Sequence, residues 1–161
     1  MKISHGFTLV ELLVTLSIVA ILAGVAAPGV LSFINNNKLI ATANELELTL
    51  NLARSEAIKR NATVEVCSMT VLAICQDDID WSDNGYIVQL QGGASIKKIA
   101  GRSDSITVVA PVTRTTFLPT GGVNVAQSFI ICDSKRVKET GYTVEIKSTG
   151  RVIAVKGVVC S

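Results

Sequence analysis

The chain has 161 residues, of which 48% are hydrophobic and 17% are charged, and its formal net charge is +2. An N-terminal apolar run leaves roughly 125 other residues, which is enough for one compact domain and too few for two. A net charge this small does not by itself indicate a particular partner. Because the only histidine, His5, precedes the apolar run and the chain has no catalytic triad or phosphate-binding glycine loop, we predict a non-enzymatic protein without a cofactor.

The first predicted element is an apolar helix. From Phe7 to Ile34 the only charged residue is Glu11, and the run exceeds the roughly 20 residues that a bilayer-spanning helix needs. A carboxylate costs about 2.5–3.5 kcal/mol at the centre of such a helix, so Glu11, near one end, still needs a partner. Pro28 removes one backbone hydrogen bond. We therefore predict a transmembrane segment over residues 7–34 with a kink at Pro28.

Other interpretations of this segment remain open. A secretory signal peptide would have a basic head and an uncharged core, whereas Lys2 is a weak head and Glu11 lies inside the core. Small residues at 23–27 could nevertheless serve a signal peptidase. An ordinary membrane anchor fits the length and leaves Glu11 without a role. In a further alternative, Glu11 is a tolerated interfacial residue that faces lipid headgroups.

A second helical pattern follows the asparagines at 35–37. Its apolar residues recur at steps of four and three, which places them on one stripe of a helix that continues to about Arg60. The stripe consists of Leu39, Ala43, Leu46, Leu50, Ala53 and Ala57. It must pack on another element, because an apolar stripe is unstable in water.

After Asn61 the chain changes to short runs rich in Val, Ile and aromatic residues, separated by glycine turns. Their spacing of roughly ten residues predicts an antiparallel sheet, or two sheets, that covers the helical stripe. The expected strands are 63–68, 85–91, 106–110, 115–118, 128–132, 142–147 and 152–155. The predicted fold class is α+β, with one globular domain over residues 35–161.

Four cysteines are scattered through this domain, at Cys67, Cys75, Cys132 and Cys160. They form no CxxC pair and have no histidine beside them, so a zinc site is disfavoured. With a membrane segment before them, an even number of cysteines indicates two disulfides in an oxidising compartment. Three pairings are possible, and we favour Cys67–Cys75, which closes a short loop, with Cys132–Cys160. Free buried cysteines are the alternative.

The residues Gly6 to Leu13, GFTLVELL, resemble the type IV prepilin signature. The resemblance implies that a prepilin peptidase cuts after Gly6 on the cytoplasmic side and methylates Phe7, so that residues 1–6 are the leader. It also implies that Glu11 pairs with the Phe7 amine of a neighbouring subunit and sets the register between subunits. The fold would then be pilin-like, with a long kinked helix packed on the sheet.

Later segments resemble the GspH/FimT/FimU group of minor pilins and pseudopilins. These are LNLARSEAIKRN (Leu50–Asn61), WSDNGYIVQL (Trp81–Leu90), FLPTGG (Phe117–Gly122) and STGRV (Ser148–Val152), with Cys160 near the end. For the charged helix residues Arg54, Glu56, Lys59 and Arg60, two roles remain open. They form either a solvated face or salt bridges that hold the helix to the sheet.

Two charged regions suggest ligands. The acidic residues Asp77, Asp78, Asp80 and Asp83 could bind Ca²⁺, but their spacing does not fit an EF-hand and a solvated acidic loop is favoured. Basic residues gather toward the C-terminus and could bind the DNA backbone without reading sequence. This second set is Lys135, Arg136, Lys138, Lys147, Arg151 and Lys156.

Some FimT-type minor pilins are DNA receptors that use a GRxR motif. This chain has Gly150-Arg151-Val152-Ile153, in which the second Arg is replaced. Lys156 could compensate, but five positions separate it from Arg151, so on a regular strand the two point to opposite faces unless a bulge intervenes. An ordinary solvated surface is the alternative.

The resemblance implies a minor pilin that primes or caps pilus assembly. It would be a single-pass inner-membrane protein with a periplasmic domain and would later enter a filament. Its partners would be major and minor pilins, the prepilin peptidase, the inner membrane and, in one alternative, DNA during natural transformation. The other alternative is a minor pseudopilin of a type II secretion system. We predict no metal site.

Overall fold

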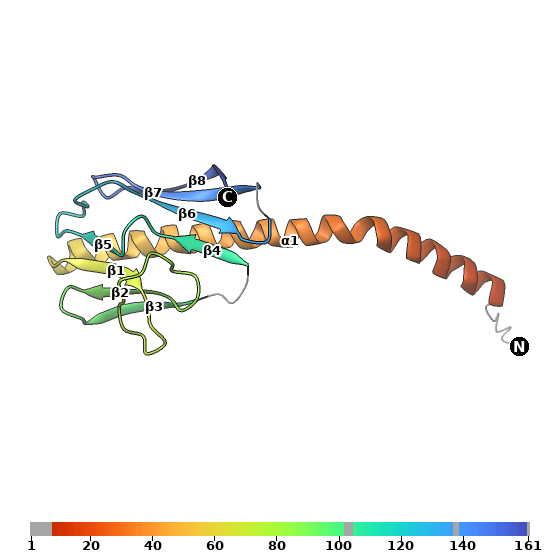
Figure 1. Ribbon diagram of the computed structural model, residues 1–161, viewed down its shortest axis with the longest axis horizontal. Helices are drawn as coiled ribbons and strands as arrows, with labels where there is room; N and C mark the ends of the chain where they lie inside the picture. Colours follow the sequence, from red (N-terminus) through yellow and green to blue (C-terminus); the bar gives the residue numbers. More distant parts are fainter. Residues whose placement is uncertain (1–7, 102–104, 137–138, 161) are drawn as a thin grey trace, which may run out of the picture. The chain divides into compact units, whose positions relative to one another are not determined.

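The computed structural model describes residues 8–101, 105–136 and 139–160, and in the long helix it does not describe the side chains of residues 25–29 and 31. Contacts within the chain define two units, Met1–Asn37 and Lys38–Ser161. The elements are drawn in Figure 1. Each unit is considered separately below.

Helix α1 (Leu9–Arg60) contributes its second part to the larger unit. There the predicted apolar stripe is buried, because every member packs in the core of that unit. Its members Leu39, Ala43, Leu46, Leu50, Ala53 and Ala57 are at most 2% exposed. The helix ends at Arg60, as predicted, and Asn61 follows in a left-handed conformation (φ 48°) that is typical after a helix end.

Among the described residues, eight antiparallel strands form two sheets in the order β3-β2-β1-β5 and β4-β6-β7-β8. Both sheets belong to the unit Lys38–Ser161. The strands are β1 (Val64–Ser68), β2 (Gly85–Leu90), β3 (Ser95–Ala100), β4 (Ile106–Val109), β5 (Arg114–Phe117), β6 (Gln127–Asp133), β7 (Thr140–Ile146) and β8 (Val152–Val159). The fold class is therefore α+β, as the sequence predicts.

The core of this unit lies where the second part of α1 runs between the two sheets (Figure 1). Trp81 is 1% exposed, and its ring lies 5.1 Å from that of Phe129 and 5.5 Å from that of Tyr86. Burial of large aromatic side chains dominates the stability of such cores. Leu46 and Leu50 belong to the same cluster, so the part of α1 from Lys38 onward is an integral part of this unit.

All seven predicted strands are present, and their ends differ by at most two residues, except that β8 continues to Val159, four residues beyond its predicted end. Strand β3 was not predicted. Its sequence, SIKKIA, places two lysines side by side, and its side chains are mostly exposed because it is the edge strand of its sheet. Lysine is a common means of protecting a sheet edge, so the weak apolar pattern has a physical reason.

Two predictions concern residues that the structure describes only in part. Helix α1 includes Pro28, but its side chain lies outside the described residues, and the kink stays a prediction. Within the described residues, no helix combines the length and apolar character needed to cross a membrane. The membrane segment predicted for residues 7–34 therefore also stays a prediction.

Candidate functional site

The start of α1 is capped by two of its own side chains. The backbone N–H of Glu11 donates to the hydroxyl oxygen of Thr8 at 3.2 Å, and the backbone N–H of Thr8 donates to the Glu11 carboxylate at 3.5 Å. This reciprocal pair is a capping box, which satisfies two N–H groups that the helix leaves free. Gly6 and Phe7 lie outside the described residues. Glu11 lies in the first turn of α1, where the negative charge of a carboxylate also interacts favourably with the helix dipole.

The following turns of α1 are apolar on all sides. From Leu9 to Leu22 every Leu, Val and Ile side chain is more than half exposed within the chain. A helix that is apolar all round is stable only in an apolar environment, such as lipid or the interior of an assembly. The stability of this part of the helix therefore requires apolar contacts from outside the unit Met1–Asn37.

The globular unit has two disulfides, Cys67–Cys75 and Cys132–Cys160. They are the two pairings that the sequence favours. The first closes the loop that leaves β1, and the second joins the end of β6 to the residue after β8. Gly141 on β7 lies beneath the second bridge, and a Cβ there would approach the Cys160 sulfur to 2.7 Å.

The acidic residues after Cys75 are engaged with the protein itself. The Arg114 guanidinium contacts the Asp77 carboxylate at 2.7 Å and the Glu65 carboxylate at 3.4 Å. Its hydrogen bond lowers the pKa of Asp77 below the usual value. Asp78 and Asp80 accept backbone N–H groups of their own loop. In the described part of the chain, no three His, Cys, Asp or Glu side chains lie close enough together to hold a metal ion.

Four of the predicted basic residues lie at the two ends of β7, and Lys156 lies within β8. Lys135 and Arg136 are in the turn between β6 and β7, whereas Lys147 and Arg151 flank the turn between β7 and β8. A strand of seven residues separates the two groups by roughly 20 Å. Lys138, between Arg136 and β7, lies outside the described residues. The structure therefore does not gather the described members of this set into one cluster.

Two members of the set form ion pairs. Arg136 contacts Asp133 at 2.7 Å and Glu139 at 2.6 Å, and Asp133 is buried. Burial raises the pKa of Asp133, but hydrogen bonds from Ser105, Arg136 and the Lys135 backbone outweigh it, so the pKa is lowered overall. Lys147 contacts Glu145 at 2.7 Å. Lys135, Arg151 and Lys156 are exposed.

Strand β8 contains a bulge, but the bulge does not lie between Arg151 and Lys156, where it would bring their side chains to the same side of the strand. The register against β7 shifts at Gly157, after Lys156 has already paired with Tyr142. From Val152 to Lys156 the strand is regular, so the exposed Lys156 lies on the same side of the strand as Val152. The bulge consequently does not bring Lys156 to the side of Arg151.

Sequence reasoning missed a convergence around Arg54. Its Nε donates to the Gly121 carbonyl oxygen at 3.0 Å, and its Nη2 donates to the Thr149 carbonyl oxygen at 3.1 Å. One helical side chain thus joins the PTGG turn to the STGR turn. The sequence left open whether Arg54 lies on a solvated face or forms salt bridges to the sheet. The structure instead gives it hydrogen bonds to main-chain carbonyl oxygens of two turns. Glu56 and Arg60 pair within the helix at 2.5 Å.

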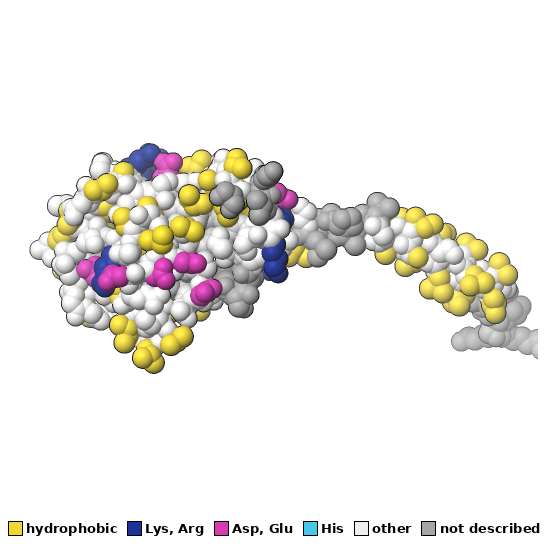
Figure 2. All heavy atoms as spheres, in the orientation of Figure 1, with side chains coloured by type: hydrophobic (Ala, Val, Ile, Leu, Met, Phe, Trp, Pro, Cys, Tyr) yellow, Lys and Arg dark blue, Asp and Glu magenta, His cyan; other side chains and the backbone are white. Residues whose placement is uncertain are grey.

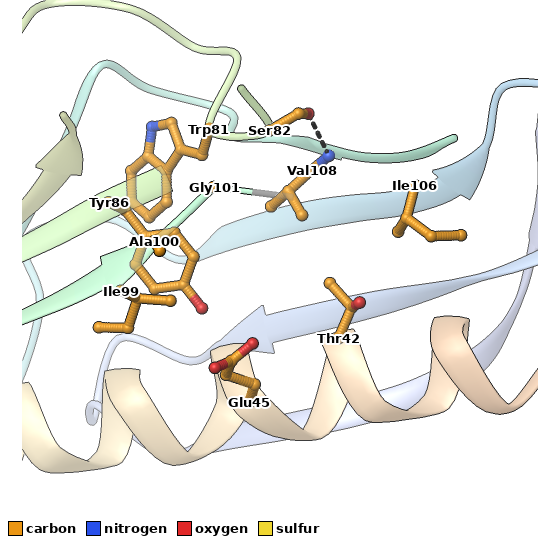
Figure 3. A pocket seen from close by; sticks show the side chains of 10 residues that line it. All are labelled: Thr42, Glu45, Trp81, Ser82, Tyr86, Ile99, Ala100, Gly101, Ile106 and Val108. Atoms are coloured by element: carbon orange, nitrogen blue, oxygen red, sulfur yellow. Dashed lines mark hydrogen bonds between the residues drawn. The ribbon is translucent and has the colours of Figure 1, made fainter. Parts of the chain in front are cut away.

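A small cavity lies between α1 and the sheets, as Figure 3 shows. Thr42 and Glu45 of the helix face Trp81, Tyr86 and Ile106 across it, and the Val108 N–H donates to the Ser82 hydroxyl at 2.9 Å. Its volume is about 10 Å³, room for about one water molecule. The cavity is too small for a substrate.

A long N-terminal helix packed on antiparallel sheets defines a pilin-like protein, and comparisons with known proteins specify the family. The family model "Type II transport protein GspH" matches residues 42–150, and the model "Prokaryotic N-terminal methylation motif" matches residues 1–27. The chain belongs to the GspH family of type IV minor pilins and pseudopilins. Membership implies assembly with other pilin-like subunits in a filament.

Solved structures agree with this assignment. A crystal structure of the type IV minor pilin FimU of Pseudomonas aeruginosa superposes with a TM-score of 0.64 at 25% identity, over 80% of this chain and 99% of that chain. A second crystal form of FimU gives a TM-score of 0.60 at 23% identity, over 75% and 98% of the two chains. No curated protein sequence matches the chain significantly.

Proposed function

We propose that this chain is a minor type IV pilin that primes or caps assembly of a surface filament. The observation that carries the proposal is the capped N-terminal helix, which is apolar on all sides and has one carboxylate in its first turn. Such a helix needs an apolar environment, and a filament interior built from like helices supplies one after extraction from the inner membrane. The similarity to FimU supports a pilus rather than another machine.

In this proposal the prepilin peptidase removes residues 1–6 and methylates the new N-terminus at Phe7. The amine of Phe7 on one subunit then pairs with the Glu11 carboxylate of its neighbour. In lipid, a carboxylate is costly unless a cation is hydrogen-bonded to it, because the surrounding hydrocarbon offers no other partner for the charge. Because the pair forms in only one axial register, it fixes the position of the incoming subunit.

The proposal is tested by following the full chain in its host cells. Glu11→Gln keeps the size of the side chain and most of the cap but removes the charge. We expect leader cleavage to continue while the amount of the subunit in sheared filaments falls about tenfold or more. Glu47→Gln, a matched change later in the same helix, should leave incorporation unaltered. Normal incorporation of Glu11→Gln would overturn the proposal.

A second candidate is a minor pseudopilin of a type II secretion system, and the description of the matching family model favours it. The two candidates differ in what the cell loses. Deletion of the gene should reduce surface pili if the chain is a pilin, and should trap secreted proteins in the periplasm if it is a pseudopilin. The same strain therefore separates them.

A third candidate is a DNA-binding minor pilin for natural transformation. It is supported by the exposed side chains of Lys135, Arg151 and Lys156. The distribution of these cations over separate surfaces limits how many phosphates one duplex can reach. Loss of transformation with normal piliation, in a strain that produces Arg151→Ala, would favour this candidate.

A further inference from the structure

The loop that leaves β1 is a hairpin closed by a disulfide. Met69 and Cys75 form an antiparallel bridge, and the Thr70 N–H donates to the Ile74 carbonyl oxygen at 2.8 Å. Across the tip, the Ala73 N–H donates to the Thr70 carbonyl oxygen at 2.8 Å. The Cys67–Cys75 disulfide closes the base. The tip is therefore held in one conformation by hydrogen bonds and by a covalent link.

The tip of this loop presents large apolar side chains to solvent. Val71 is 86% exposed, Leu72 is 78% exposed and Ile74 is 59% exposed. Figure 2 shows hydrophobic side chains gathered at the lower edge of the globular unit, where Figure 1 places the loop after β1. Turn tips are normally polar, because Gly, Pro, Asn, Asp and Ser serve them best. We name Val71, Leu72 and Ile74 the apolar tip.

The core of the domain does not explain the apolar tip. The inner side of the loop is already anchored, since Ala73 and Cys75 pack on Met69 and the sheet residue Ile87. Ala73 adopts a left-handed conformation with φ 59°, which is uncommon for a residue other than glycine. The fold thus maintains an unfavourable backbone conformation within the loop that carries the apolar tip, and such local strain is found at functional surfaces.

Carboxylates outnumber cations around the apolar tip, although Ile74 also borders a pocket that Lys98 of β3 and Arg114 of β5 line. Residues 61–96 contain five carboxylates, Glu65, Asp77, Asp78, Asp80 and Asp83, and no lysine or arginine. Arg114 of β5 contacts two of them, Asp77 and Glu65. Figure 2 shows acidic side chains on the same face as the hydrophobic group. An anionic lipid surface would repel this face, so a complementary partner carries positive charge around an apolar pocket.

We propose that the apolar tip and the acidic residues beside it dock into another filament subunit, in an apolar pocket bordered by Lys or Arg side chains. This inference rests on the proposed function and names the surface through which the chain contacts its neighbour. Interfaces of this kind concentrate their affinity in a few apolar anchors within a polar rim.

A second copy of this chain is a poor match for the pocket. One apolar groove lies on the outer face of the sheet β4-β6-β7-β8, has a volume of about 260 Å³ and is lined by Val109, Ile130 and Val158. A second groove, of about 600 Å³, is bordered by Lys98 and Arg114, but Ile74 of the apolar tip and Glu65 also line it. Asp80 forms a backbone β-bridge with Val109 beside the first groove, and Glu65 and Ile74 line the second, so the tip of a second copy would meet a carboxylate or another apolar tip at either groove. The partner is therefore a subunit of different sequence.

The test places a photoreactive benzophenone amino acid at position 72 of the full chain in host cells. We expect a crosslink to another pilin subunit, at an apolar segment flanked by Lys or Arg when the linked peptide is sequenced. Val125 is the matched control position, because it is 69% exposed and lies in a different loop. The double substitution Val71→Ser with Leu72→Ser should lower incorporation into sheared filaments about tenfold or more, whereas Val125→Ser should not.

Charge is tested separately. Asp78→Asn and Asp80→Asn keep the oxygens that accept backbone N–H groups, and together they should weaken the crosslink about two- to fivefold. Crosslinks to lipid, to a second copy or to nothing, with wild-type protein present in filaments, would overturn this inference and leave the proposed function standing. Absence of the wild-type protein from filaments would overturn both.

Discussion

The backbone of Gly150 lies directly against the carbonyl oxygen of Gly121. A Cβ at position 150 would overlap that oxygen, and Gly150 also has a left-handed conformation with φ 78°. Arg54 binds the carbonyl oxygen of the same Gly121, so a helix and two turns meet at one point. The glycine of the GRVI segment is thus required by packing, independently of any ligand of Arg151.

Gly150→Ala should destabilise the domain by about 3 kcal/mol or more, because the left-handed penalty adds to a backbone overlap that cannot relax. Gly92→Ala is the matched control. Gly92 also has a positive φ, 104°, but a Cβ there would meet no atom within 4 Å, so the loss should not exceed about 2 kcal/mol. Urea unfolding of the full chain in detergent, followed by fluorescence of the single, buried Trp81, measures both. Equal losses would contradict the close-packing argument.

Arg54→Ala should cost about 1.5–3 kcal/mol, since a charged donor is removed from two carbonyl oxygens. Arg54→Lys should recover only part of this, because an ammonium group lacks the planar fork that reaches both acceptors. Arg60→Ala provides the control on the same helix. It breaks a pair with Glu56 at the helix surface and should cost about 0.3–0.5 kcal/mol. If Arg60→Ala lowered the free energy of unfolding as much as Arg54→Ala, the hydrogen bonds from Arg54 to the two turns would not be the source of the stabilisation.

Much of the fold could be predicted from local patterns. The stripe from Leu39 to Ala57 identified the buried face of α1, since a helix with a period of 3.6 residues has only one way to bury it. Strand β3 could not be predicted, because Lys97 and Lys98 remove the apolar alternation from an edge strand. Its place is determined by pairing with β2, and that information lies outside its own sequence.

The candidate site was predictable only in part. The sequence around Glu11 is a local motif, and the cap with Thr8 lies within one helical turn. Arg54, by contrast, binds residues 67 and 95 positions away, and no local pattern indicates such a contact. The division of the basic residues between the ends of β7 likewise follows from topology rather than from their spacing in the chain.

The two disulfides should differ in their contribution to stability. The bridge Cys132–Cys160 spans 28 positions and Cys67–Cys75 spans 8. In the chain-entropy model these loops correspond to about 3.6 and about 2.5 kcal/mol. Replacing Cys132 and Cys160 together by Ser should therefore lower the urea midpoint more than replacing Cys67 and Cys75. The reverse order would show that strain or residual structure outweighs loop length.

Acid should weaken the domain through Asp133. Its pKa is lowered in the folded state, so its stabilising contribution is present above the unfolded value of about 3.9 and is lost as the pH falls through the folded value. Between pH 6 and pH 3 the free energy of unfolding should decrease, and Asp133→Asn should reduce this dependence. Asp78→Asn, at an exposed position, is the control for the general effect of removing a carboxylate. An unchanged pH profile in Asp133→Asn would contradict the assignment.

DNA binding by the full chain should be weak and only mildly dependent on salt. The exposed cations Lys135 and Arg151 lie at opposite ends of β7, and Lys156 faces another side, so one duplex should contact these three described cations through about two phosphates. The logarithm of the binding constant should then fall with the logarithm of the salt concentration with a slope near −2. Fluorescence anisotropy with a labelled duplex measures this slope, and Arg151→Ala should reduce its magnitude by about one.

Lys147→Ala is the control, since that side chain is already paired with Glu145. A slope steeper than about −4, lowered by both Arg151→Ala and Lys156→Ala, would instead support a DNA receptor whose surface combines these cations.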